Sequence, residues 1–405
     1  MTAGSLSPDT VGGPDGQVAP ALLERLRSVL AADGSYPTPS RVAEALRSEG
    51  GVYGDAAVLA VVDALRRDTL GAGPLEPLLR TPGVTDVLVN GPREVYIDRG
   101  RGLEAASVMF GDDAAVRRLA QRLAAAGGRR LDDATPFVDV RLADGTRFNA
   151  VLAPVSRPGT CLSLRVPARR VFELDELVAA GTVSVAGAGL LRDIVAAELA
   201  FLISGGTGSG KTTLLASLLS LVPPTERIVI VEDSAELRPH HPHAVSLQGR
   251  TPNVEGAGAV SLRDLMRQAL RMRPDRLVVG ECRGAEVVDL LGALNTGHEG
   301  GAGTIHANSA GDVPIRLAAL GLLSGVPAAA LQAQMTAAIQ LVIHMRRSAG
   351  GRVVEEIVVL HPGEHGVTTV PAWHRLGGVR PGSVALADLL TARGVRVPAA
   401  LLAGA

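Results

Sequence analysis

The chain has 405 residues, and its 46% hydrophobic content suffices for the buried cores of two or three domains. Its 40 basic and 41 acidic residues give a formal net charge of −1, which provides no overall positive field to hold nucleic acid or an anionic membrane. The few aromatic residues leave little material for stacking single-stranded bases, and the two widely spaced cysteines support neither a disulfide framework nor a zinc ribbon.

The N-terminal part combines an unpatterned segment with helical patterns. Residues 1–18 lack periodicity, so we expect a disordered terminus. They also lack the basic flank and the apolar run of a secretory signal. Helical spacing over 22–30, from Pro39 and from Asp55 predicts a small helical headpiece over residues 19–71. No apolar run in the sequence is long enough to cross a bilayer, and we therefore expect a cytoplasmic protein.

Residues 72–166 change to the period of two that is typical of strands, which predicts an α+β domain. A helix is expected over 112–126, and Asp144-Gly145 marks a hairpin turn. Strands are expected over 85–90, 95–98, 137–142, 146–152 and 161–166.

After an arginine-rich linker at 167–176, short apolar strands alternate with helices, and we expect one α/β domain over 177–405. Alternation of this kind predicts a parallel sheet covered on both faces, with ligands at the carboxyl ends of its strands. Strands are expected over 200–204, 227–231, 276–280 and 303–306, and helices over 212–221 and 262–271.

The sequence from Gly205 to Thr212 fits the phosphate-binding pattern G-x-x-x-x-G-K-[ST], and it follows an apolar strand and precedes a helix. Lys211 is the one lysine of the whole chain, so the other 39 basic residues are arginine. A single lysine in a chain that otherwise uses arginine predicts a role that a planar guanidinium group cannot perform. The alternative is an ordinary glycine-rich turn. The predicted nucleotide-binding residues are Gly205, Gly206, Thr207, Gly208, Ser209, Gly210, Lys211, Thr212 and Thr213.

We expect Lys211 to reach the β and γ phosphates of the nucleotide and Thr212 to ligate magnesium. A guanine-reading N/T-K-x-D element would need a second lysine, so the pattern favours ATP over GTP. Two acids then follow at the ends of predicted strands, Glu232 in EDSAE and Glu281 in GECRG. Such acids can hold magnesium or polarise the attacking water, whereas a single one could equally be a solvated loop carboxylate.

Two histidines, His298 and His306, bracket a glycine-rich turn and are candidate sensors of the γ-phosphate. A metal site is the less favoured interpretation because no cysteine accompanies them. A second group, His240, His241 and His243, lies among prolines and is expected to be a loop without a ligand.

Taken together, the phosphate loop, VEDSAEL, RPDRLVVGECRG and TGHEGGAGTIHANS resemble the secretion and pilus-assembly ATPases of type II secretion, type IV pili and type IV secretion. Three further segments are most similar to the tight-adherence (Tad/Flp) pilus branch of that superfamily: GPLEPLL (73–79), VTDVLVNGPREVYID (84–98) and DGTRFNAVLAPVSRPGTCLSLR (144–165). The resemblance covers residues 65–345. The cysteine tetrad that binds zinc in some relatives is missing from this sequence.

The resemblance implies a RecA-like P-loop parallel-sheet domain after the α+β domain, with ATP and Mg²⁺ as the ligands. It makes Glu232 and Glu281 the catalytic and magnesium-organising acids, leaves open which of them polarises water, and makes His298 and His306 sensors. It also implies arginines that reach the triphosphate. Arg147 and Arg165 are preferred because each lies in a predicted strand of the matched block, and the other candidates are Arg157, Arg263 and Arg271.

The functional expectation is a motor ATPase that powers pilus assembly or protein secretion. Its relatives imply a homo-hexamer, peripheral to the inner face of the cytoplasmic membrane, that works on an inner-membrane platform protein. ATP is expected between the α+β and parallel-sheet domains, which would hinge about the linker on hydrolysis. Three alternatives remain: a type IV secretion ATPase for conjugal transfer, a RecA-like motor that binds nucleic acid, and a regulator that only binds nucleotide.

Overall fold

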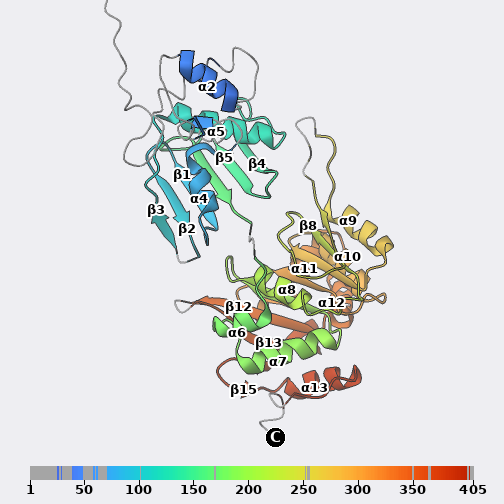
Figure 1. Ribbon diagram of the computed structural model, residues 1–405. Helices are drawn as coiled ribbons and strands as arrows, with labels where there is room; N and C mark the ends of the chain where they lie inside the picture. Colours follow the sequence, from blue (N-terminus) through green and yellow to red (C-terminus); the bar gives the residue numbers. More distant parts are fainter. Residues whose placement is uncertain are drawn as a thin grey trace, which may run out of the picture. The chain divides into compact units, whose positions relative to one another are not determined.

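The computed structural model divides into two compact units, residues 1–167 and 168–405 (Figure 1). The residues described are 39–48, 71–100, 102–167, 170–250, 256–348, 351–363 and 366–398, with the single residues 25, 26, 29, 58, 59, 61, 62, 252 and 401. Helix α2 (Pro39–Ser48) begins at the proline expected to open a helix. Most of the residues in the other two headpiece helices, over 22–30 and from Asp55, lie outside the described part of the chain.

The first unit contains an antiparallel sheet of six strands in the order β3-β2-β1-β6-β5-β4. Alternation of apolar and polar residues places Val87, Val89, Phe148 and Leu164 on one face, where they are fully buried. The Asp144-Gly145 turn joins β4 to β5 as expected. The strands are β1 (Asp86–Asn90), β2 (Val95–Asp98), β3 (Leu103–Ala105), β4 (Phe137–Arg141), β5 (Arg147–Val151) and β6 (Cys161–Arg165), preceded by the short helices η2 (Gly73–Leu75) and α4 (Glu76–Arg80).

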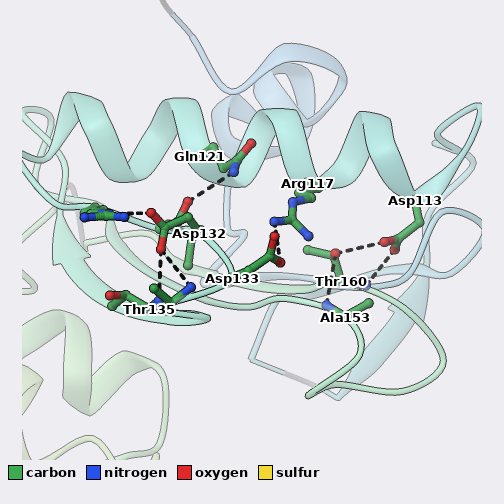
Figure 2. Close-up of polar contacts among 11 residues, drawn as sticks. Asp113, Arg117, Gln121, Asp132, Asp133, Thr135, Ala153 and Thr160 are labelled. Atoms are coloured by element: carbon green, nitrogen blue, oxygen red, sulfur yellow. Dashed lines mark hydrogen bonds and ion pairs between the residues drawn. The ribbon is translucent and has the colours of Figure 1, made fainter.

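Helix α5 (Asp113–Ala126) contributes Val116, Leu119 and Leu123 to the core that lies on the buried face of this sheet. Its polar residues attach two loops, as Figure 2 shows. Asp113 accepts hydrogen bonds from the backbone N–H of Thr160 at 2.6 Å and from its hydroxyl at 3.0 Å. One turn and two turns later, Arg117 pairs with Asp133 at 2.7 Å and Gln121 donates to the carbonyl oxygen of Leu131 at 3.1 Å. Helix α5 therefore holds loops 131–135 and 153–160 in place.

The second unit is built on a sheet of nine strands in the order β15-β14-β13-β12-β7-β11-β10-β8-β9. The six strands from β12 to β9 pair in parallel, and β12, β13, β14 and β15 pair antiparallel. The strands are β7 (Phe201–Gly205), β8 (Ile228–Glu232), β9 (Ala244–Gln248), β10 (Arg276–Cys282), β11 (Ala302–Ile305), β12 (Leu341–Ser348), β13 (Gly351–Gly363), β14 (Gly366–His374) and β15 (Gly378–Val379).

Helices cover both faces of this sheet, and each face has its own hydrophobic core. Alternate residues of β7 divide between the two cores, because Phe201 and Ile203 belong to one and Leu202 to the other. On the first face lie α6 (Leu174–Ala179), α7 (Val185–Ala196), α8 (Lys211–Leu219) and α13 (Ser383–Ala392). On the second lie α9 (Leu262–Ala269) with η3 (Leu270–Met272), α10 (Glu286–Leu294), and α11 (Val313–Leu322) with η4 (Ala310–Asp312) and α12 (Ala328–Ala338).

This architecture confirms the expected fold class, an α+β unit followed by a RecA-like parallel-sheet unit. Helix α6 begins at Leu174, within the stretch that the sequence suggested as a linker. None of the helices in the described residues is long and apolar enough to span a membrane.

Candidate active site

The glycine-rich segment lies between the buried strand β7 and helix α8, at the carboxyl end of a central strand of the parallel sheet. Gly205 adopts a φ of +151°, and a Cβ at this position would collide with the carbonyl oxygen of Met345 on β12. Gly210 adopts a left-handed φ of +97° where α8 begins. These two backbone positions explain why glycine is needed at both ends of the loop.

Lys211 is 7% exposed, and its ammonium group lies against its own loop. The Nζ atom donates hydrogen bonds to the carbonyl oxygens of Gly205 at 2.9 Å and Gly206 at 3.0 Å, and it lies 3.4 Å from Nδ1 of His306. Burial lowers the pKa of Lys211, and the nearby charge of Glu281 partly opposes this shift. The buried hydroxyl of Ser209 has no hydrogen-bond partner among the described residues. The loop thus offers a cation, glycine turns and an unused donor, which suit the phosphates of a nucleotide.

Glu281, on β10, contacts both an arginine and the histidine that lies beside Lys211. Its carboxylate pairs with Arg283 at 2.6 Å and lies 3.0 Å from Nε2 of His306, whose other ring nitrogen faces Lys211. Burial and the charge of Lys211 lower the pKa of His306, while Glu281 acts in the opposite direction. Lys211, His306, Glu281 and Arg283 therefore form a connected polar chain, the lysine–glutamate cluster. Thr212 follows Lys211 in the sequence. Hydroxyl and carboxylate oxygens, such as those of Thr212 and Glu281, are of the kind that magnesium prefers as ligands.

Glu232, the other predicted acid, has a different environment. It is 4% exposed at the end of β8, and its carboxylate accepts hydrogen bonds from the backbone N–H groups of Glu236 at 3.2 Å and Leu237 at 3.0 Å. Its side chain crosses Gly280, where a Cβ would collide with it. These contacts fix the loop after β8 against the end of β10.

The two predicted histidines lie in different surroundings. His306 belongs to the lysine–glutamate cluster, whereas Nδ1 of His298 lies 3.2 Å from the carbonyl oxygen of Ala293, near the end of α10. Within the described part of the chain, no three His, Cys, Asp or Glu side chains are grouped so as to hold a metal ion.

The predicted arginines of the first unit lie side by side on its sheet. Arg147 on β5 and Arg165 on β6 are direct cross-strand partners, and they pair with Asp139 at 2.6 Å and Asp86 at 3.1 Å, respectively. Arg157 is exposed in the loop before β6. In the second unit, Arg263 pairs with Asp289 at 2.7 Å, and Arg271 is exposed in η3.

Two features of the site were missed at the level of sequence. Arg283, which lies in GECRG, was not predicted, although its position two residues after Glu281 was a usable signal. His344, a single histidine in the apolar strand β12, is 4% exposed, and its Nδ1 lies 2.9 Å from the hydroxyl of Ser204, just before the loop. Burial lowers the pKa of His344. Only its polarity within an apolar run could have drawn attention to it.

This chain is similar to several known proteins. The model of the type II/IV secretion system protein family matches residues 68–362. A putative conjugal transfer protein of Mycobacterium tuberculosis (strain H37Rv) is 56% identical over 349 residues, which cover 84% of this chain and 99% of that protein. The conjugal transfer protein TrbB of Rhizobium radiobacter is 34% identical over 284 residues, which cover 68% of this chain and 83% of that protein. The VirB11 ATPase of the Brucella suis type IV secretion system covers 71% of this chain and 95% of its own, with 26% identity and a TM-score of 0.38.

Proposed function

This chain belongs to the type II/IV secretion system protein family, and from that premise we propose that it is a Mg²⁺-dependent ATPase that converts ATP hydrolysis into mechanical work. The observation that carries the proposal is the position of Lys211. The one ammonium side chain of the protein is buried at the end of the glycine-rich loop, and Glu281 and His306 lie beside it. A cation, an acid and an imidazole at the carboxyl end of a parallel strand are suited to phosphoryl transfer.

In the proposed reaction, phosphate oxygens replace the carbonyl oxygens of Gly205 and Gly206 as partners of the Lys211 ammonium group. This exchange is favourable because a hydrogen bond between two charged groups is stronger than one to a neutral carbonyl. Thr212 and Glu281 would hold magnesium, which supplies positive charge next to the phosphates. His306 lies between Lys211 and Glu281, where it can sense the γ-phosphate through either neighbour.

Water activation is assigned to Glu281 or Glu232, and the contacts favour Glu281. Its carboxylate meets the side chains of Arg283 and His306, both of which can rearrange, whereas Glu232 is buried and bonded to two backbone N–H groups. We propose that Glu232 positions the end of β10. We propose that His298 supports the turn before β11. Arg147 and Arg165 remain candidates for reaching the triphosphate.

The machine served by this motor is proposed to be a secretion or transfer apparatus in the cytoplasmic membrane. The segments that resemble the tight-adherence branch favour pilus assembly, and the names of two relatives, both conjugal transfer proteins, favour a type IV system at least equally. In either case we propose a cytoplasmic homo-hexamer that acts on a membrane platform protein. Pilin and prepilin-peptidase genes beside its gene would favour the pilus, and relaxase and coupling-protein genes would favour conjugal transfer.

Substitution of Lys211 tests the proposal. We expect Lys211→Ala to abolish ATP turnover, measured as phosphate release, because the variant lacks the ammonium group that is proposed to bind the phosphates. The same should hold for Lys211→Arg, since a planar guanidinium does not fit where a compact ammonium group is enclosed by two carbonyls.

The fold of Lys211→Ala should persist, because removing a buried amine relieves its desolvation. Circular dichroism and thermal unfolding provide this control. Full turnover by the folded Lys211→Ala variant would refute the assignment of the site.

A further inference from the structure

A hairpin of the second unit brings two arginines to the phosphate loop. Strand β12 pairs in parallel with β7 up to Met345 and Gly205, so the residues that follow on β12 run past the beginning of the loop. Arg347 on β12 and Arg352 on β13 are direct cross-strand partners in this hairpin. Both side chains are exposed.

The two arginine side chains lie beside the middle of the loop. The Nε atom of Arg352 donates a hydrogen bond to the carbonyl oxygen of Gly208 at 2.9 Å. An Nη atom of Arg347 lies 3.3 Å from the place where a Cβ of Gly208 would be, and Cδ of Arg352 lies equally close to the corresponding place at Gly210. The loop that is expected to enclose the phosphates is therefore flanked by two positive charges besides Lys211.

This arrangement has no counter-charge from the described residues. Like charges placed directly opposite on an antiparallel pair are destabilising. Nevertheless, no carboxylate among the described residues pairs with Arg347 or Arg352, whereas the neighbouring Arg346 pairs with Glu355 at 3.0 Å. An anion that lies against the loop would remove this repulsion.

We propose that Arg347 and Arg352 bind the phosphate chain of ATP from within the same subunit. This inference rests on the proposed function and adds two ligands from the β12–β13 hairpin to that site. A guanidinium group can donate two parallel hydrogen bonds to phosphate oxygens. The hydrogen bond from Nε to Gly208 holds the guanidinium group of Arg352 beside the loop. Recognition is of the phosphates, so inorganic tripolyphosphate should compete for the same residues.

The experiment measures ATP·Mg²⁺ affinity of the full-length protein by calorimetry, and competition by tripolyphosphate. The variants are Arg347→Ala and Arg352→Gln, in which glutamine keeps a donor for Gly208 without the charge. The matched control is Arg346→Ala, which removes the same charge from the adjacent position. We expect Arg347→Ala and Arg352→Gln each to weaken ATP and tripolyphosphate binding by about tenfold or more, as for hydrogen bonds between charged groups. Arg346→Ala should change the affinity by about threefold at most, as for an exposed ion pair.

The outcomes separate this inference from the proposed function. If the wild-type protein binds ATP and both test variants bind it equally well, the phosphate role of the hairpin is wrong while the nucleotide site stands. An equal loss in Arg346→Ala would also overturn the inference, because the effect would then be one of overall charge. If the wild-type protein binds no ATP, the proposed function fails and this inference fails with it.

Discussion

At the scale of single residues, the two predicted acids differ in what surrounds them. Glu281 makes ion pairs with side chains, and Glu232 accepts hydrogen bonds from the backbone. A carboxylate held by the backbone contributes to the fold, because the N–H groups that it satisfies would otherwise lie unpaired near a buried side chain. The two acids should therefore fail in different ways when they are neutralised.

We expect Glu281→Gln to lower the rate of ATP hydrolysis by at least about a hundredfold while ATP still binds, because the charge that organises His306 and Arg283 is lost. Glu232→Gln should lower the free energy of unfolding by about 1–3 kcal/mol, since its amide cannot accept as strongly from the N–H groups of Glu236 and Leu237. Single-turnover hydrolysis and urea unfolding of each variant measure the two effects.

The reverse pattern would contradict this division of roles. If Glu281→Gln unfolds more easily at unchanged turnover, and Glu232→Gln is stable but inactive, then Glu232 is the acid that acts in the reaction. The choice between the two glutamates could not be made from the sequence, because both follow an apolar strand in the same way.

At the scale of secondary-structure elements, helix α5 provides a matched pair of aspartates. Asp112 caps the helix by accepting a hydrogen bond from the N–H of Ala115 at 2.7 Å, and the adjacent Asp113 binds Thr160, which is 47 positions away in sequence. Asp112→Ala should cost about 1 kcal/mol of stability through loss of the cap alone. Asp113→Ala should in addition release loop 153–160, and the released loop should become a site of proteolytic cleavage.

Limited proteolysis with mass spectrometry checks this prediction, with Asp112→Ala as the control for general destabilisation. Cleavage within 153–160 should accelerate in Asp113→Ala only. Equal acceleration in both variants would mean that the loop responds to helix stability and not to its own attachment.

The elements found from the sequence are those with a clear signal. The glycine-rich turn, the alternation in β4, β5 and β6 and the face of α5 predict their elements within a few residues, because local spacing and turn chemistry agree there. Helices α11 and α12 were not predicted because they contain few polar residues, so that no polar face gives the pattern a period. Strand β12 was missed because its apolar residues come first and its exposed polar residues follow in a block, so no alternation of period two marks the strand. The hairpin that flanks the loop was missed with it.

Similar limits apply to the site. The loop residues follow from a motif whose spacing is dictated by the phosphate that it encloses. Contacts between distant strands, such as His344 with Ser204 and Arg352 with Gly208, depend on which strands are neighbours in the sheet. Because β12 lies beside β7 although 135 residues separate their ends, no local pattern in the sequence could reveal these contacts.

At the scale of the whole molecule, the described residues of the two units form separate hydrophobic cores, one in the first unit and two in the second. We therefore expect two transitions in scanning calorimetry. ATP·Mg²⁺ at about a hundred times its dissociation constant should stabilise the unit that contains Lys211 by about 2.7 kcal/mol, which corresponds to an increase in its Tm of roughly 5–10 °C. The increase should be absent in Lys211→Ala, and its absence in the wild-type protein would contradict nucleotide binding by this unit.

The buried setting of Lys211 also has a practical consequence for chemical labelling. Apart from the α-amine at the start of the chain, the protein contains a single amino group that an acylating reagent can modify. That amine is enclosed by two carbonyls and is largely shielded from solvent, so its modification should be slow. Phosphates that replace the carbonyls should slow it further, because a neighbouring anion favours the charged, unreactive form of the amine. One mass shift on one peptide would then follow occupancy of the loop in the intact, unmutated protein.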